Sequence, residues 1–455
     1  MIVKKYIKEK TAMQEEIYIG VAQADIVPPF SLFMGGYAAR GNKHFEDIYD
    51  SPSAGIVSLR QGKRKVMIVR ADLSAMDANI IQEVSEKLEE KYQIPQDCIL
   101  FNVSHTHSAP LGSPMDSILL TDEDHKLYRK FVSFLIDRLL QISNKAIKDE
   151  EPCSIYLAKT SFDLGLNRRK KIGQEIRNAP EKNGFIDNDL PLVVIKNRQH
   201  NIKSIIFSCA CHPVTLGSGN FKLSADFPGY AAAYIQRHLD CTTFFLQGCG
   251  GDIRPKILEN GDCWRKGTLD DLEIQGKKLG QTVIKALSGK MEKLYPCINS
   301  IKSAFALKYE KKMSVDDYEM VLNDPQSNLI KKKWAANMKK LLKKGLKSQA
   351  KHHFILQKIS LSENTHIFAM SGEVVAEIGK KIKNLAPNMN IITLGYSHAS
   401  SCYIPSKKMF SEGGYEVESY YHFSLPGKLS SDTEDIIINS CKNLFTQSNK
   451  FIYKN

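Results

Sequence analysis

The sequence predicts an α/β protein in which mixed or parallel sheets are flanked by helices. Apolar, β-branched runs alternate with helical patterns along most of the 455 residues, and such alternation is typical of this class. The chain is 42% hydrophobic and 25% charged, which is the composition of a globular protein with a large core. No internal repeat or low-complexity tail interrupts the pattern. This length allows two to three average domains, but α/β enzymes often run long as one unit, and we expect a single domain over residues 1–455.

Hydrophobic periodicity places the elements up to residue 288. The expected strands are short runs rich in Val, Ile and Phe, and the expected helices are longer segments with a helical apolar period. We predict strands at 17–24, 55–60, 65–71, 98–104, 153–160, 192–197, 203–211 and 242–247. We predict helices at 79–92, 123–147, 228–239 and 269–288.

The pattern changes between residues 298 and 362. A strand is followed by a lysine-rich helical stretch and then by the apolar run 353–356. We interpret this segment as an inserted or lid-like subdomain. The α/β alternation then resumes, with a strand at 364–370, a helix at 373–385, a strand at 390–395 and a helix near 431–446.

The formal charge of +13 at pH 7 raises the question of a polyanionic partner. Much of the excess lies in residues 331–351, where lysines surround Trp334, Met338, Leu341 and Leu342. This pattern predicts an amphipathic basic helix whose solvated face covers an apolar seam. A basic surface-binding module is the alternative. No nucleic-acid motif accompanies the segment, so we expect a small-molecule substrate and no nucleic-acid partner.

The ends of the chain and its cysteines suggest a compartment. The first ten residues are basic and develop no apolar core of a signal peptide. No apolar run approaches the ~20 residues that cross a bilayer, so we expect no stable membrane insertion. Ten cysteines are scattered without framework spacing, which suggests free thiols in a reducing compartment. We therefore expect a cytoplasmic protein.

The most informative stretch is residues 104–110, which follow the apolar run 99–103. His105 and His107 are two residues apart, so on an extended backbone both imidazoles point to the same face. Paired histidines at the end of a strand suit a metal centre at the edge of a sheet. A pair of histidines on a solvated loop is the alternative for this short motif.

Four further apolar runs also end in polar or glycine-rich loops. These loops begin with His212 after 205–211, with residues 247–252 after 244–246, with residues 371–373 after 367–370, and with residues 395–398 after 391–394. In open α/β sheets the ligand crevice lies beyond the carboxyl ends of the strands. Each loop has a simpler interpretation: His212 as a buried core histidine, Glu373 as a carboxylate at a helix start, and residues 248–252 as a tight turn. The coincidence of five such ends favours a common site.

The order and spacing of these motifs resemble the neutral/alkaline, non-lysosomal ceramidase family of zinc amidases. The T-H-T-H-S-G-P signature of that family is similar to residues 104–110, with Ala109 in place of glycine. The resemblance extends over about residues 17–425. Its other motifs are similar to residues 20–26, 34–38, 167–168, 212–213, 251–255, 371–373, 402–404 and 415–416.

The resemblance implies a metal site and a set of catalytic residues. It implies that zinc is bound by His105, His212, Glu373 and Tyr403, a mixed N/O set with room for water. The implied reaction is hydrolysis of a linear amide by attack of a zinc-bound water. The resemblance also implies catalytic and substrate-binding roles, in which a histidine shuttles the proton and other groups stabilise the oxyanion. These residues are His107, Arg168, Tyr415 and Asp252 as catalytic groups, and Arg254 and Arg169 as substrate-binding groups.

Three departures from the family bear on the substrate. Arg254 stands where the family has a serine, no secretory leader is expected, and the chain ends near where the C-terminal immunoglobulin-like domain of the family would begin. Arginines near the site favour a soluble, polar or acidic amide over ceramide. The alternatives are true ceramide hydrolysis, an amidohydrolase-type barrel, in which H-x-H ends the first strand, and a degenerate, non-catalytic binding protein.

Overall fold

The computed structural model describes residues 15–113, 120–346, 349–399 and 402–452. Its centre is an open mixed sheet of nine strands, in which β4–β5 and β10–β12 are parallel pairs and the other pairs are antiparallel. In spatial order the strands are β12 (Thr242–Gln247), β10 (Ile202–Cys209), β9 (Asp189–Asn197), β6 (Glu151–Ser161), β1 (Ile17–Asp25), β3 (Ser53–Gln61), β4 (Arg64–Ala71) and β5 (Ile99–Val103), with β16 (Glu292–Leu294) beside β6. This open order excludes the amidohydrolase-type barrel.

A second sheet of four strands packs against the first. Its strands, in spatial order, are β17 (Pro296–Lys308), β18 (Lys351–Ser362), β19 (Thr365–Met370) and β21 (Asn390–Leu394), and only β19 and β21 are parallel. One apolar core joins the two sheets, with Val57 and Ile68 from the first and Ile359 and Ile367 from the second. The mixed α/β architecture predicted from the sequence is confirmed.

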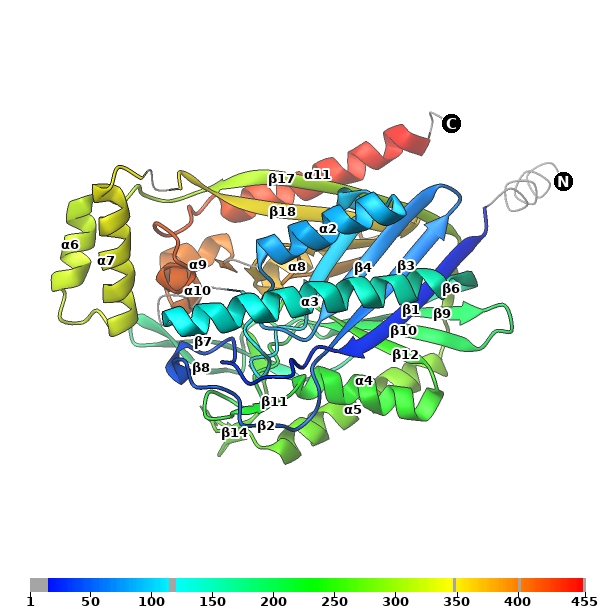
Figure 1. Cartoon of the computed structure of the whole chain (residues 1–455), viewed down its shortest axis with the longest axis horizontal. Helices are drawn as coiled ribbons and strands as arrows, with labels where there is room; N and C mark the ends of the chain where they lie inside the picture. Colours follow the sequence, from blue (N-terminus) through cyan, green and yellow to red (C-terminus); the bar gives the residue numbers. More distant parts are fainter. Residues whose placement is uncertain (1–14, 114–119, 347–348, 400–401, 453–455) are drawn as a thin grey trace.

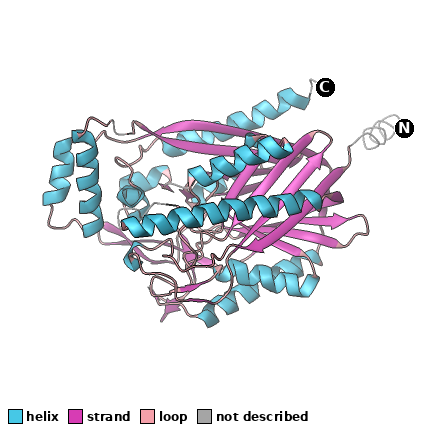
Figure 2. Cartoon of the chain, in the orientation of Figure 1, coloured by secondary structure: helices cyan, strands magenta, loops and turns pink. Residues whose placement is uncertain are grey.

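Helices cover the outer faces of both sheets (Figures 1 and 2). Side chains alternate along each strand, so Ile56 of β3 faces the helices while Val57 faces the second sheet. The outer face of the nine-stranded sheet is covered in one part by α2 (Ala78–Tyr92) and α3 (Asp122–Lys148) and in another by α4 (Asp226–Leu239) and α5 (Leu269–Leu287). The outer face of the second sheet is covered by α8 (Ala376–Lys383) and α11 (Thr433–Ile452). The result is a four-layer α/β/β/α sandwich.

Local sequence explains where the long helices begin. Thr121 and Thr268 each accept a hydrogen bond from the backbone N–H three residues on, and Asp124 and Asp271 bond back to the backbone of the threonine. These capping boxes satisfy N–H groups that the first helical turn leaves free. The predicted helices at 123–147 and 269–288 therefore begin within one residue of the observed ones.

Some predicted elements differ from the structure. The helix predicted at 373–385 begins at Ala376, because Glu373 and Val374 form a short strand, β20 (Glu373–Val374), that pairs with β22 (Tyr403–Ile404). The final helix extends from Thr433 to Ile452, beyond the range near 431–446. The sequence did not predict β7 (Gly165–Ile172) and β8 (Glu175–Glu181), which form a small sheet with β13 (Ile253–Pro255).

The segment expected to be a lid contains both sheet strands and a helical hairpin. β17 and β18, at its two ends, belong to the second sheet. Between them, α6 (Val315–Asn323) and α7 (Leu329–Lys343) stand side by side at one end of the molecule (Figure 1). Over the described residues, no helix combines the length and the apolarity that a membrane span requires.

Candidate metal centre

The strand ends that the sequence singled out meet at one place. His105 follows β5, His212 follows β10, and Glu373 follows β19. Glu373 and Tyr403 lie side by side because β20 and β22 pair in parallel with these two residues in register. Both sheets therefore contribute to the cluster: β5 and β10 belong to the first, and β19 to the second.

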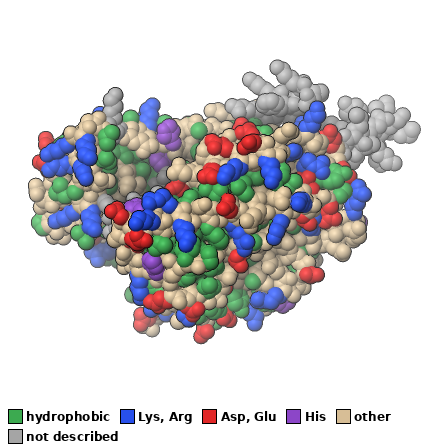
Figure 3. Space-filling view, viewed as in Figure 1, with side chains coloured by type: hydrophobic (Ala, Val, Ile, Leu, Met, Phe, Trp, Pro, Cys, Tyr) green, Lys and Arg blue, Asp and Glu red, His purple; other side chains and the backbone are tan. Residues whose placement is uncertain are grey.

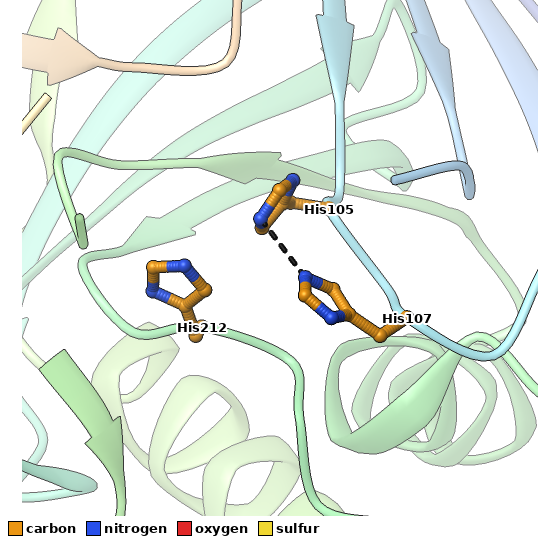
Figure 4. A group of neighbouring side chains, drawn as sticks. All are labelled: His105, His107 and His212. Atoms are coloured by element: carbon orange, nitrogen blue, oxygen red, sulfur yellow. Dashed lines mark hydrogen bonds between the residues drawn. The ribbon is translucent and has the colours of Figure 1, made fainter. Parts of the chain in front are cut away.

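Three buried histidines lie at the centre of this cluster (Figure 4). His105 and His107 face one another, with 3.1 Å between their Nε2 atoms. One ligand nitrogen from each of His105, His107 and His212 lies within 4.8 Å of the others, so the three can hold a metal ion. His105 adopts a positive φ of 65°, a backbone conformation that non-glycine residues rarely occupy outside functional or tightly constrained sites.

Backbone carbonyls determine which nitrogen of two histidines carries the proton. His105 Nδ1 lies 2.5 Å from the Ser74 carbonyl oxygen, and His212 Nδ1 lies 2.6 Å from that of Gly250. A carbonyl only accepts hydrogen bonds, so each Nδ1 is the donor. In the neutral ring each Nε2 is then an acceptor. This is the arrangement by which proteins orient metal-binding histidines.

The acceptor atoms point at a shared carboxylate. Glu373 Oε2 lies 3.2 Å from His105 Nε2 and 3.1 Å from His212 Nε2, and all three side chains are buried. Three acceptors at hydrogen-bond distance are stable together only if a cation or a proton lies among them. This donor set therefore fits a metal ion.

Burial and charge shape the ionisation of the cluster. Burial lowers the pKa of His212 to about 4, although Glu373 opposes the shift. Burial also lowers the pKa of His107 well below its usual value, and His105 and His212 lower it further. Burial by itself would raise the pKa of Glu373, but the two neighbouring histidines hold it well below its usual range. Near neutral pH Glu373 is therefore an ionised carboxylate, and the rings of His107 and His212 are neutral.

Two tyrosines complete the cluster. The Tyr403 hydroxyl lies 3.4 Å from His212 Nε2, and the rings of the two residues are stacked with centroids 6.3 Å apart. The Tyr396 hydroxyl lies 3.4 Å from the same nitrogen, and its ring centroid is 4.3 Å from that of His105. Tyr403 was in the predicted ligand set, whereas Tyr396 was not singled out as a site residue.

Arg168 lies against the two predicted tyrosines. Its guanidinium carbon is 5.3 Å from the ring centroid of Tyr403 and 5.6 Å from that of Tyr415. Its Nε donates to Glu416 at 2.8 Å, and its buried Nη2 has no hydrogen-bond partner among the described residues. Although burial acts against the charge, Tyr403 and Glu416 raise the pKa of Arg168 well above its usual value. Arg168 is therefore a fixed cation, and its interaction with the Tyr403 side chain contributes to the raised pKa.

Arg169 and Asp252 have structural partners. Arg169 donates to Glu416 at 2.5 Å and to the Gly413 carbonyl at 2.8 Å. Both carboxylate oxygens of Asp252 accept hydrogen bonds, from Asn167 Nδ2 at 2.8 Å and from the Ala376 N–H at 2.9 Å. Burial raises the pKa of Asp252 to about 6. Asp252 thus ties the strand that carries Arg168 to the helix that follows Glu373.

Arg254 lies on β13, close to the site but not in its innermost part. Its guanidinium is 4.8 Å from the ring centroid of Trp264, and its Nη1 is 3.5 Å from Asn178 Oδ1. Burial lowers the pKa of Arg254, while the nearby Tyr37 raises it. Its neighbours therefore include a tyrosine that lines the site cavity.

A cavity of about 400 Å³ opens onto the histidines. It is lined by His105, His107, Glu373, Tyr403 and Tyr415, and also by residues that the sequence did not indicate. These include Ile330 of α7, His422 and Phe423. Tyr37, which lies in the noted segment 34–38, also lines the cavity. A larger cavity of about 1400 Å³ lies between α4 and β1 and contains none of the predicted site residues.

The sequence did not identify the residues that hold the site side chains in place. Gly36 lies against the ring of His107, and Arg40 donates to the His107 carbonyl at 2.5 Å. Glu416 joins Arg168 to Arg169. Gly36 and Glu416 lie in segments that resemble motifs of the family, and Tyr396 lies in one of the strand-end loops. Their positions in the sequence could therefore have indicated that they belong to the site. Gly250 lies in the noted strand-end loop 247–252, whereas nothing in the sequence marks Ser74; both act through backbone carbonyls.

Comparisons with known proteins identify the family and the fold. The family model described as "Neutral/alkaline non-lysosomal ceramidase, N-terminal" matches residues 17–273. The crystal structure of neutral ceramidase from Pseudomonas aeruginosa is similar, with a TM-score of 0.72, 13% sequence identity, and coverage of 95% of this chain and 75% of that chain. A structure described as ceramidase complexed with C2 has the same TM-score of 0.72 and 13% identity, covering 94% of this chain and 74% of that one.

Proposed function

Because the chain belongs to the neutral/alkaline non-lysosomal ceramidase family, we propose that it is a zinc-dependent hydrolase of linear amides. Family membership supports a hydrolase. The observation that carries the finer proposal is the approach of His105 Nε2 and His212 Nε2 to Glu373 Oε2, at 3.2 and 3.1 Å. These atoms are acceptors on side chains buried at the end of a cavity, which is the arrangement that a cation requires.

The zinc ligands in this proposal are His105, His212, Glu373 and Tyr403. Two imidazole nitrogens, a carboxylate and a phenol oxygen form a donor set that suits zinc. When bound, zinc supplies Lewis acidity, which lowers the pKa of water towards about 7 and polarises a carbonyl group. His107 completes the histidine cluster but is assigned a different role, because the other four residues already supply four ligands.

The proton moves through His107. Its Nε2 faces the cluster, and its buried Nδ1 has no hydrogen-bond partner among the described residues. Because the ring is neutral near pH 7, it can take a proton from the nucleophile and pass it to the leaving amine.

Arg168 and Tyr415 stabilise the negative charge that develops on the amide oxygen. Arg168 contributes its guanidinium, which lies against Tyr403 and Tyr415, and Tyr415 contributes a hydroxyl at the cavity wall. Asp252 and Arg169 act as positioning residues. Asp252 fixes Asn167 and Ala376, while Arg169 holds Glu416, the partner of Arg168.

The substrate in this proposal is a soluble, polar or acidic N-acyl compound. Arg254 and Arg168 place two guanidinium groups near the cavity, and guanidinium groups bind carboxylates in a two-pronged geometry. A cytoplasmic location, as the sequence predicts, fits a soluble substrate of this kind. The substrate is a small molecule in either case, whether acidic amide or ceramide.

A substrate panel tests the proposal. Zinc-loaded protein is assayed with several N-acyl amino acids and with a short-chain ceramide, before and after treatment with a chelator. We expect release of amine from the acidic amides, loss of this activity on chelation, and recovery when zinc is restored. Faster turnover of the ceramide would instead assign the lipid-amide reaction. Absence of any amide hydrolysis by zinc-loaded protein would support the degenerate binding alternative.

A further inference from the structure

Helix α7 carries a strongly basic outer face that the proposed reaction does not use. Lys333, Lys340, Lys343 and Lys344 are exposed, and Lys332 is half-buried. At 100° per residue these five positions fall on one side of the helix. They extend from Lys332 to Lys344, a rise of about 18 Å along the helix axis. We call this set of five lysines the lysine face.

Only a small part of the charge of the lysine face is balanced within the hairpin, where Lys343 lowers the pKa of Glu319 and Lys332 lowers that of Asp324. Helix α7 contains no acidic residue. Among the described residues, the ion pair of this helix is that of Lys339 with Glu319, and Lys339 lies outside the lysine face. Lys333, Lys340, Lys343 and Lys344 are exposed and form no ion pair among the described residues. The face therefore keeps an excess of positive charge, which attracts a polyanionic partner.

The opposite side of α7 attaches it firmly to the body of the protein. Trp334 is buried, packs edge-on against Tyr318 of α6 with centroids 5.3 Å apart, and donates from Nε1 to the Leu425 carbonyl at 2.9 Å. Tyr420 of η4 (Ser419–Phe423) packs on the other side of the indole at 5.4 Å. The lysine face is therefore held in one orientation.

Apolar groups accompany the lysines on the same hairpin. Leu329, at the start of α7, is 67% exposed, and Met320 of α6 is 71% exposed. A groove of about 400 Å³ runs between the two helices, with Leu322 and Ala336 in its walls and lysines around it. In Figure 3, basic and hydrophobic side chains occur together at the end of the molecule where α6 and α7 lie. Lipid surfaces present this combination of anionic headgroups and apolar chains, whereas nucleic acids do not.

The hairpin also lies beside the entrance to the metal centre. Ile330, the second residue of α7, lines the site cavity together with His422 and Phe423 of η4. A surface bound by the lysine face would therefore lie close to the opening of the cavity.

We propose that the lysine face and the neighbouring apolar side chains of the α6–α7 hairpin dock on the surface of a bilayer that contains anionic lipids. Each lysine near such a surface adds to the attraction, and the attraction weakens as salt screens the charges. The hairpin rests on the surface without inserting, since the part of the chain that the structure describes has no membrane-spanning helix. The inference concerns binding and does not depend on which amide the site cleaves.

Co-sedimentation with vesicles tests the inference without any substrate. The full chain is mixed with phosphatidylcholine vesicles that contain about a third of phosphatidylglycerol, and with vesicles of phosphatidylcholine alone, at about 0.1 M salt. We expect binding to the anionic vesicles only. A variant with Lys333→Gln, Lys340→Gln, Lys343→Gln and Lys344→Gln should bind them about 10²- to 10³-fold more weakly. Glutamine preserves helix propensity at these exposed positions.

A matched control removes the same charge elsewhere. Lys277, Lys278, Lys285 and Lys290, on and just after α5, are also exposed and have no recorded ion pair among the described residues. Their replacement by Gln should leave vesicle binding nearly unchanged. Equal loss of binding in both variants would show that only net charge matters, and it would overturn the proposed docking surface. Equal binding of the wild-type chain to neutral and anionic vesicles would also overturn it. Tighter binding to a double-stranded DNA fragment than to anionic vesicles would assign the face to nucleic acid instead.

Discussion

His105 and His212 show how single backbone carbonyls prepare a metal site. The carbonyl oxygens of Ser74 and Gly250 take the Nδ1 protons, so both Nε2 lone pairs are directed at the carboxylate of Glu373. His107 differs from these two, since its Nδ1 has no such carbonyl among the described residues. Because their Nδ1 atoms are held by backbone carbonyls, we assign His105 and His212 as ligands, and we assign His107, which lacks such a bond among the described residues, as the catalytic histidine.

Replacement of His107 distinguishes catalysis from metal binding. We expect His107→Ala to keep its zinc and to lose rate by a factor on the order of 10² to 10⁴, the usual range for a lost general acid or base. Activity and zinc content are measured on the same sample, with the exposed His238→Ala as a control that changes neither. Loss of zinc from His107→Ala would place His107 among the ligands.

Arg254 determines the preference between acidic and neutral substrates in our account. Arg254→Ser should lower kcat/KM for N-acyl amino acids by about 10- to 100-fold, the worth of a hydrogen bond to a charged group, and should affect a neutral amide little. Arg177→Ser on β8 is the matched control, because that side chain is exposed. The prediction is wrong if a short-chain ceramide is the faster substrate and Arg254→Ser leaves the ratio unchanged.

The sequence indicated which residues lie at the site better than it indicated their hydrogen-bond partners. Three of the four ligands implied by the family resemblance, His105, His212 and Glu373, follow apolar strands, and strand ends are visible in a sequence. Tyr403 joins them through the pairing of β20 with β22. The partners of Arg169 were not predictable, since Glu412, Gly413 and Glu416 are more than 240 residues away along the chain. Backbone carbonyls such as that of Ser74 are equally invisible, because every residue has one.

Short elements, more than long ones, position the groups of the site. The parallel pairing of β20 with β22 sets Glu373 beside Tyr403, and the turn that contains Gly35 and Gly36 lies against His107. Gly36 has a φ of 92°, and a Cβ at this position would lie 2.4 Å from the ring of His107. The glycine therefore makes room for the histidine.

Substitution of Gly36 tests this turn. Gly36→Ala should displace the His107 ring and reduce kcat/KM about 10²-fold, which is the effect of a small misplacement of a catalytic group, while zinc is retained. Gly41→Ala is the control: its φ of 61° imposes similar backbone strain, but its Cβ would meet no atom within 4 Å. Equal loss of activity in the two variants would attribute the effect to backbone strain alone.

Long elements were predicted well, and short ones were not. The helix predicted at 79–92 is observed as Ala78–Tyr92, because its apolar period extends over four turns. The strands β7 and β8 were missed because their sequences are polar and half exposed, as in the segment 170–181. Residues 373–374 were predicted as part of the helix because a strand of two residues is too short to show an alternating apolar pattern. They form a strand only through pairing with Tyr403 and Ile404.

The two sheets of the molecule meet at the metal centre. His105 and His212 come from the nine-stranded sheet, and Glu373 follows a strand of the four-stranded sheet. A bound ion would therefore join the two halves of the sandwich. Such an arrangement was not predictable from local patterns, because the order of the strands and the packing of one sheet on the other depend on contacts far apart in the sequence.

Buried titratable groups determine how the stability of the metal-free protein depends on pH. Six histidines have lowered pKa values, mainly through burial: His107, His212, His352, His366, His398 and His422. Between about pH 4 and pH 6.5 the unfolded chain binds more protons at these groups than the folded one, so stability rises with pH. Burial also raises the pKa of Asp50, Asp226 and Asp252 to about 6, which opposes this trend.

Because the histidines outnumber these carboxylates, Tm of the metal-free protein should rise from about pH 5 to about pH 7. Thermal unfolding of chelator-treated protein in buffers of equal ionic strength measures this dependence. A fall in Tm over the same interval would show that the three aspartates dominate.

The most direct test of the central claim is the zinc content of the purified chain and its variants. We predict about one zinc per chain in the wild type and in the control His238→Ala, and none in His212→Ala or Glu373→Ala, with circular dichroism showing that all four are folded. A folded His212→Ala that retains one zinc per chain, or a wild-type chain that takes up none from a zinc-containing buffer, would contradict the account.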